Sequence, residues 1–148
     1  MTSLPYIAAA FVVGMLVSTQ PALNAILARA IASPYAATSI SILVAFVCSL
    51  VVLALTGRGE LSAQTLGSVP LWVFLAGVVG MLFVGGGIVI APVIGALAFF
   101  ICVVAGQLVG AALADHFGAF GLVERALTPQ RGLGIVMVVA GAWIVSRG

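Results

Sequence analysis

Residues 93–114 read VIGALAFFICVVAGQLVGAALA, a stretch of 22 residues without one Asp, Glu, Lys or Arg. An α-helix rises about 1.5 Å per residue, so this stretch would be about 33 Å long and would cross a hydrocarbon layer roughly 30 Å thick. The stretch therefore predicts a transmembrane helix.

Four further apolar stretches accompany it, at about residues 4–32, 36–55, 69–90 and 128–146. Hydrophobic residues make up 64% of the 148-residue chain, charged residues make up 5%, and the mean hydropathy is +1.40. A water-soluble domain of that composition would aggregate, and the continuous apolar runs lack the alternation that a membrane β-barrel requires. We predict an all-α membrane protein, a single transmembrane domain over residues 1–148 with five transmembrane helices.

The positive charges are few and evenly divided. If five helices cross the membrane, three arginines fall on one side and two on the other, namely Arg58, Arg125 and Arg131 against Arg29 and Arg147. The excess of Lys and Arg that normally fixes orientation is nearly absent. We expect dual topology, with the chain forming an antiparallel homodimer with an inverted copy or a heterodimer with a related subunit. The alternative is a single orientation that is set after insertion.

Polar residues interrupt the first stretch in the sequence STQPALN, residues 18–24. Gln20 and Asn24 are about one helical turn apart and share a face. Unpaired amides are costly at membrane depth, so these two either bind a substrate or hydrogen-bond a neighbouring helix, and the residues alone leave both open. Ser18 and Thr19 are further candidates for substrate contact.

Two features predict hinges. Pro21 lacks the backbone N–H that would bond the carbonyl of Val17, which predicts a bend in the first helix. Three consecutive glycines, Gly85, Gly86 and Gly87, lower the stiffness of the third helix.

Two glycine pairs suit close helix packing, at a dimer contact or within one chain: Gly106 with Gly110, and Gly134 with Gly141. Gln107 and Asp115 are eight positions apart and therefore lie on one face of the 93–114 helix, which makes Gln107 another candidate for substrate contact. Asp115 and His116 are either a gate or proton site at the mouth of a cavity, or simply charges at a helix end.

Other classes of function find no support in the residues. Cys48 and Cys102 lie inside predicted spans, where they are expected to be small apolar filler. We predict no catalytic residue, no metal site and no cofactor, and a net charge of +2 spread singly along the chain predicts no nucleic-acid partner.

Three segments carry a resemblance to a known family: QPALNA at 20–25, AGQL at 105–108 with DHFG at 115–118, and TPQR at 128–131. Over essentially its whole length the chain resembles the YdcZ-type family of small inner-membrane proteins. That family belongs to the drug/metabolite transporter superfamily, with the EamA-like carriers and the small multidrug resistance proteins. The resemblance implies a half-transporter of five helices in the bacterial inner membrane, working as an antiparallel pair in a family of exporters with mostly unassigned substrates.

The multidrug relatives carry a glutamate deep in their first helix, whereas the corresponding region here offers only hydroxyls and amides. We therefore predict a secondary transporter that exports a small polar metabolite, neutral or zwitterionic, rather than a cationic drug. Its access would alternate around a lipid-embedded site at the dimer midplane, lined by Gln20, Asn24 and Gln107. The alternatives are a channel and a non-transporting accessory subunit.

Overall fold

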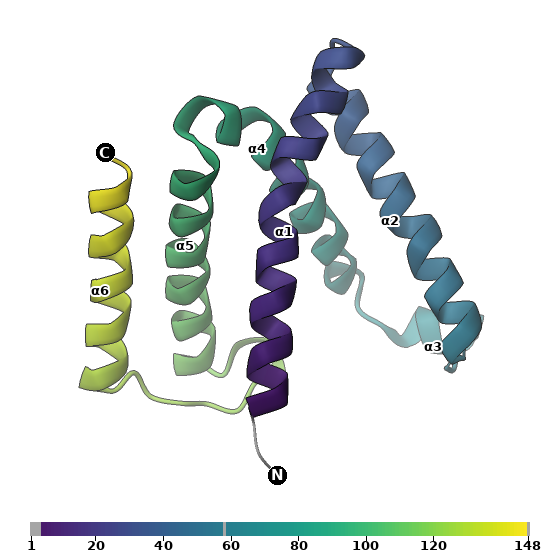
Figure 1. Cartoon of the computed structure of the whole chain (residues 1–148). Helices are drawn as coiled ribbons and strands as arrows, with labels where there is room; N and C mark the ends of the chain where they lie inside the picture. Colours follow the sequence, from purple (N-terminus) through teal and green to yellow (C-terminus); the bar gives the residue numbers. More distant parts are fainter. Residues whose placement is uncertain (1–3, 58, 148) are drawn as a thin grey trace. The chain divides into compact units, whose positions relative to one another are not determined.

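The computed structural model describes residues 4–57 and 59–147 (Figure 1). Arg58, which entered the charge comparison above, lies outside the described residues. The chain divides into two compact units, Met1–Pro92 and Val93–Gly148, and each is described by itself.

The described elements are helical. The first unit contains α1 (Leu4–Ala30), α2 (Pro34–Thr56), the short α3 (Ala63–Ser68), a 3₁₀ turn η1 (Leu71–Phe74) and most of α4 (Leu75–Ile94). The second unit contains α5 (Ala96–His116), a 3₁₀ turn η2 (Ala119–Gly121) and α6 (Pro129–Val145).

Four helical segments are long and apolar enough to cross a membrane: α1, α2, η1 with α4, and α5. The last helix, α6, is apolar but has only 17 residues. An all-α membrane protein is therefore confirmed, with four to five spans.

A tight turn joins α1 to α2. Ala32 adopts a left-handed conformation with φ of 52°, and the Ala36 N–H then donates to Ser33 Oγ at 3.2 Å. A serine cap followed by Pro34 at the first helical position is a strong start signal for α2.

Small side chains allow α1, α2 and α4 to meet. Ala28 of α1, Ala37 of α2 and Ile88 of α4 form a buried cluster, with Leu27 and Val84 packed against it. In lipid, helices associate through close packing rather than through exclusion of water, and alanines permit that approach. This cluster places the middle of α4 beside the polar segment of α1.

The third predicted stretch, 69–90, corresponds to η1 and α4 but ends at Ile94. Pro92 is accommodated in the last turn of α4, where it removes only one backbone hydrogen bond. Gly95, with φ of 86°, ends the helix and precedes α5.

Helices α5 and α6 pack side by side as a hairpin (Figure 1). The segment between the two helices is hydrogen-bonded to the last turn of α5, because the Arg125 N–H donates to the Asp115 carbonyl oxygen at 2.8 Å. Thr128 then caps α6 by accepting from the Arg131 N–H at 3.3 Å. Charged residues are thereby gathered at one end of the hairpin.

Candidate substrate site

Asn24 lies where α1 packs against α4. Its side chain is buried with only 8% exposed, and together with Gln20 and Pro21 it lines a small space against Phe83, Val84 and Gly87 of α4. None of this space is wide enough to admit a water molecule. The structure therefore shows the α1–α4 contact closed.

The contact lies within the apolar length of both helices. Helix α4 has 20 residues, so it is about 30 Å long and matches the hydrocarbon thickness. Phe83 and Gly87 lie near its middle, eight residues after Leu75 and seven before Ile94. On α1, Asn24 is six residues before Ala30, about 9 Å from the end of that helix.

The amide of Asn24 has an unpaired hydrogen-bond donor. Its Nδ2 is buried and has no hydrogen-bond partner among the described residues. Leaving a buried donor unpaired costs about 1–3 kcal/mol, and most buried polar groups in proteins avoid that cost. This N–H is therefore available to a partner that the closed contact does not contain.

The neighbouring hydroxyls are already satisfied as donors. Ser18 Oγ donates to the Met15 carbonyl at 2.7 Å and Thr19 Oγ1 donates to the Leu16 carbonyl at 2.8 Å, and both residues are exposed. In this conformation each hydroxyl can still accept a hydrogen bond but has no proton to offer. Their role as substrate contacts stays a prediction.

The predicted hinges are both helical in this structure: α1 continues through Pro21, and α4 continues through Gly85, Gly86 and Gly87. A Cβ atom on Gly85 would lie 3.4 Å from Thr38 Oγ1 of α2, so Gly85 also permits close packing. Bending at either place stays a prediction.

Thr38 was missed in the sequence analysis. It is only 6% exposed, and its hydroxyl donates to the Pro34 carbonyl at 2.9 Å. The one available signal was a hydroxyl near the start of an apolar stretch, which the helix backbone can satisfy without any partner.

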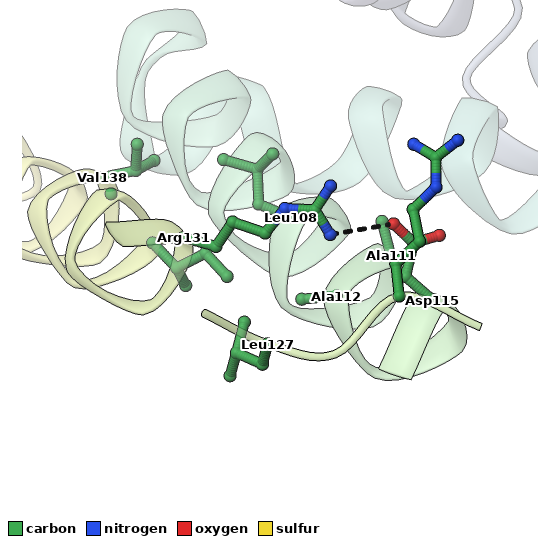
Figure 2. A pocket seen from close by; sticks show the side chains of 10 residues that line it. Leu108, Ala111, Ala112, Asp115, Leu127, Arg131 and Val138 are labelled. Atoms are coloured by element: carbon green, nitrogen blue, oxygen red, sulfur yellow. Dashed lines mark ion pairs between the residues drawn. The ribbon is translucent and has the colours of Figure 1, made fainter. Parts of the chain in front are cut away.

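Asp115 and His116 both hold the segment that follows α5. Asp115 Oδ2 lies 3.8 Å from Arg131 Nη1, an ion pair drawn in Figure 2, and His116 Nδ1 accepts from the Leu127 N–H at 3.4 Å. That bond requires Nδ1 to be unprotonated. The sequence analysis missed the role of Arg131, because it depends on the hairpin bringing residues 115 and 131 together.

Gln107 is exposed in the second unit, so its meeting with Gln20 and Asn24 stays a prediction. Gly106 and Gly110 are exposed on α5. A Cβ atom on any of the four predicted packing glycines, 106, 110, 134 and 141, would meet nothing within 4 Å. Their close contacts, if they make any, are therefore outside the described packing.

Comparison with known proteins decides the family. A family profile described as "Putative inner membrane exporter, YdcZ" matches residues 5–144. The chain belongs to the YdcZ family. It is thus a multi-pass inner-membrane protein, in a family described by export rather than by an enzymatic activity. Among the described residues no three His, Cys, Asp or Glu side chains gather as a metal site would require.

A curated YdcZ relative is the Inner membrane protein YdcZ of Escherichia coli strain K12, which is 34% identical over 93 residues. The match covers 63% of this chain and spans 59% of the relative's length. No solved structure matches the chain.

Replacing Asn24 by leucine distinguishes a ligand group from an interhelical hydrogen bond. Because the amide N–H is unpaired, we expect Asn24→Leu to leave the free energy of unfolding unchanged or to raise it by about 1 kcal/mol. Thermal unfolding of the purified protein in detergent measures this. Thr38→Val is the matched control, since it removes a hydroxyl bonded within its own helix. A loss of about 0.6–2 kcal/mol in Asn24→Leu alone would mean that Asn24 joins helices.

Proposed function

We propose that this YdcZ-family chain is a secondary transporter that exports a small polar metabolite, with the α1–α4 contact at Asn24 as its substrate site. The observation that carries the proposal is the buried, unpaired Nδ2 of Asn24 in the α1–α4 contact. A transport site must hold polar groups that the substrate satisfies during passage, and this N–H is such a group.

The residues around Asn24 favour a substrate without net charge. The lining of the contact contains two amides and no ionisable side chain, so a bare cation or anion would find no counter-charge there. Asn24 Nδ2 suits a carbonyl, hydroxyl or carboxylate oxygen of the solute. The Val17 carbonyl, which Pro21 deprives of its usual donor, suits an N–H or O–H. A neutral polar or zwitterionic metabolite offers both.

Transport requires the closed contact to open. We assign that motion to α4 moving away from α1, with Gly85, Gly86 and Gly87 as the flexible segment, in alternating access to the two sides. The second half of the transporter is an inverted copy or a related subunit, as in the wider drug/metabolite transporter superfamily. The exposed Gly106 and Gly110 of α5 leave room for such a contact, and Gln107 would complete the site.

Counterflow in proteoliposomes tests the function. The probes are radiolabelled amino acids, small amides and polyols, each loaded unlabelled inside and offered labelled outside. We expect saturable counterflow with at least one zwitterionic or neutral solute. Asn24→Leu should weaken the apparent affinity about 2–10-fold for a solute that offers a neutral oxygen and about 10–150-fold for one that offers a carboxylate. These factors correspond to hydrogen bonds of about 0.5–1.5 and 1.5–3 kcal/mol.

Thr38→Val serves as the control and should transport like the unaltered protein. Unsaturable leak through the unaltered protein would indicate a channel. Absence of counterflow with the whole panel, or equal affinity in Asn24→Leu, would count against the proposed site.

The double variant Gly85→Ala/Gly86→Ala tests the hinge. The new Cβ atoms would lie 3.4 Å from Thr38 Oγ1 and 3.8 Å from Ile90 Cδ1, so both methyl groups fit. Alanine favours the helix by about 0.8–1 kcal/mol over each glycine, so thermal unfolding should rise while counterflow slows several-fold. Gly77→Ala in the same helix, which would meet nothing within 4 Å, is the control. A more stable double variant that transports at the normal rate would exclude the hinge.

Reporter fusions test the inverted pairing. Fluorescent protein and alkaline phosphatase, active on opposite sides of the inner membrane, are fused in turn after Glu60 and after the carboxyl terminus. Because the arginines divide almost evenly between the two sides, we expect both reporters to be active at both positions. Activity of one reporter only at each position would rule out the homodimer and leave the paired subunit.

A further inference from the structure

A cavity lies at the charged end of the α5–α6 hairpin. It encloses about 430 Å³, and Figure 2 shows the side chains that line it. Asp115, Arg125 and Arg131 are its charged members, and the rest of the lining is apolar: Leu108, Ala111, Ala112, Leu127, Gly134, Ile135 and Val138. Its lining shares no residue with the α1–α4 contact.

The charges that line this cavity do not balance. The lining contains two arginines and one aspartate, and the neighbouring Glu124 is not part of it, so one positive charge is left over. The ion pair itself is loose, with Arg131 Nη1 at 3.8 Å from Asp115 Oδ2 and both side chains partly exposed, and such a pair contributes little. Arg125 is held at the cavity because its backbone N–H donates to the Asp115 carbonyl oxygen at 2.8 Å. The mouth is therefore built to favour an anion.

The apolar walls extend from this mouth towards the membrane interior. Leu108 lies seven residues before Asp115 on α5, and Val138 lies seven residues after Arg131 on α6. At about 1.5 Å per residue, both side chains are about 10 Å deeper along the antiparallel pair. A ligand that fills the groove must combine an anionic group at the helix ends with an apolar part that runs inward.

We propose that this cavity is a binding site for an acidic phospholipid. The phosphate lies between the guanidinium groups of Arg125 and Arg131, and the first part of one acyl chain follows the groove past Ile135 to Leu108 and Val138. Helix ends are where headgroups lie, and basic pockets between membrane helices bind anionic headgroups. Arginine suits the phosphate because its planar guanidinium binds phosphate oxygens in pairs. Inorganic phosphate would leave the apolar groove empty, whereas a phospholipid would fill it with an acyl chain. The groove therefore favours a phospholipid over free phosphate as the source of the anion.

Native mass spectrometry of the purified full-length protein, with phosphatidylglycerol or phosphatidylcholine added to the detergent, tests the site. We expect selective retention of phosphatidylglycerol, and a drop of roughly tenfold or more in Arg125→Gln/Arg131→Gln. Arg147→Gln is the matched control, since Arg147 lies at the other end of α6 over the Trp143 ring at 3.9 Å and should retain the lipid normally. Asp115→Asn should retain more phosphatidylglycerol, and a gain of binding cannot arise from misfolding.

Four results would overturn the proposal. Retention of phosphatidylglycerol by the double variant at the normal level would remove the two arginines from the site. An equal loss in Arg147→Gln would indicate attraction by net charge alone. A loss in Asp115→Asn would contradict the charge argument. Release of phosphatidylglycerol by inorganic phosphate would assign the cavity to a free anion.

Discussion

The scarcity of water in the bilayer governs this structure. Polar groups at membrane depth need a partner within the protein, and several hydroxyls of the spans find one by donating to a carbonyl three or four residues earlier in their own helix. Ser18, Thr38 and Ser49 all do so, at 2.7–2.9 Å. Asn24 cannot, and its Nδ2 stays unpaired. Against a background of satisfied hydroxyls, this one amide is what distinguishes the α1–α4 contact from ordinary helix packing.

The same solvent explains why so little of the chain is buried. Between 6% and 17% of the residues in the most apolar window of each span are buried in the structure, and large side chains such as Leu55 and Val93 are 80% exposed or more. In water such a surface would drive aggregation, but lipid tails solvate leucine and valine as well as a protein core does. The buried cluster of Ala28, Ala37 and Ile88 is accordingly small. Wide apolar faces remain for lipid.

Hydropathy alone predicted the all-helical membrane fold and the approximate position of its apolar helices, because length and the absence of charge are sufficient for that. The count of five spans stays a prediction, since α6 has only 17 residues. It could not predict which faces meet. Helix α4 is apolar on all sides, so no amphipathic pattern indicates that Phe83 and Gly87 face Asn24. Small residues such as Ala28 and Ala37 determine which helix faces pack together. Because alanine is common throughout the chain, it does not mark those faces in the sequence. The ion pair of Asp115 with Arg131 could not be predicted from the sequence either, since it follows from the path of residues 117–128 and from positive φ angles at Gly118 and Phe120.

Depth separates the two kinds of polar chemistry in this protein. All three acidic residues are outside the middle of the spans: Glu60 precedes α3, Asp115 is in the last turn of α5, and Glu124 is in the connecting segment. A charge at the bilayer centre costs about 2.5–3.5 kcal/mol even on the most lenient scale, whereas an amide costs less and keeps its direction. The polar side chains that line the α1–α4 contact are accordingly the amides of Gln20 and Asn24 rather than charged groups.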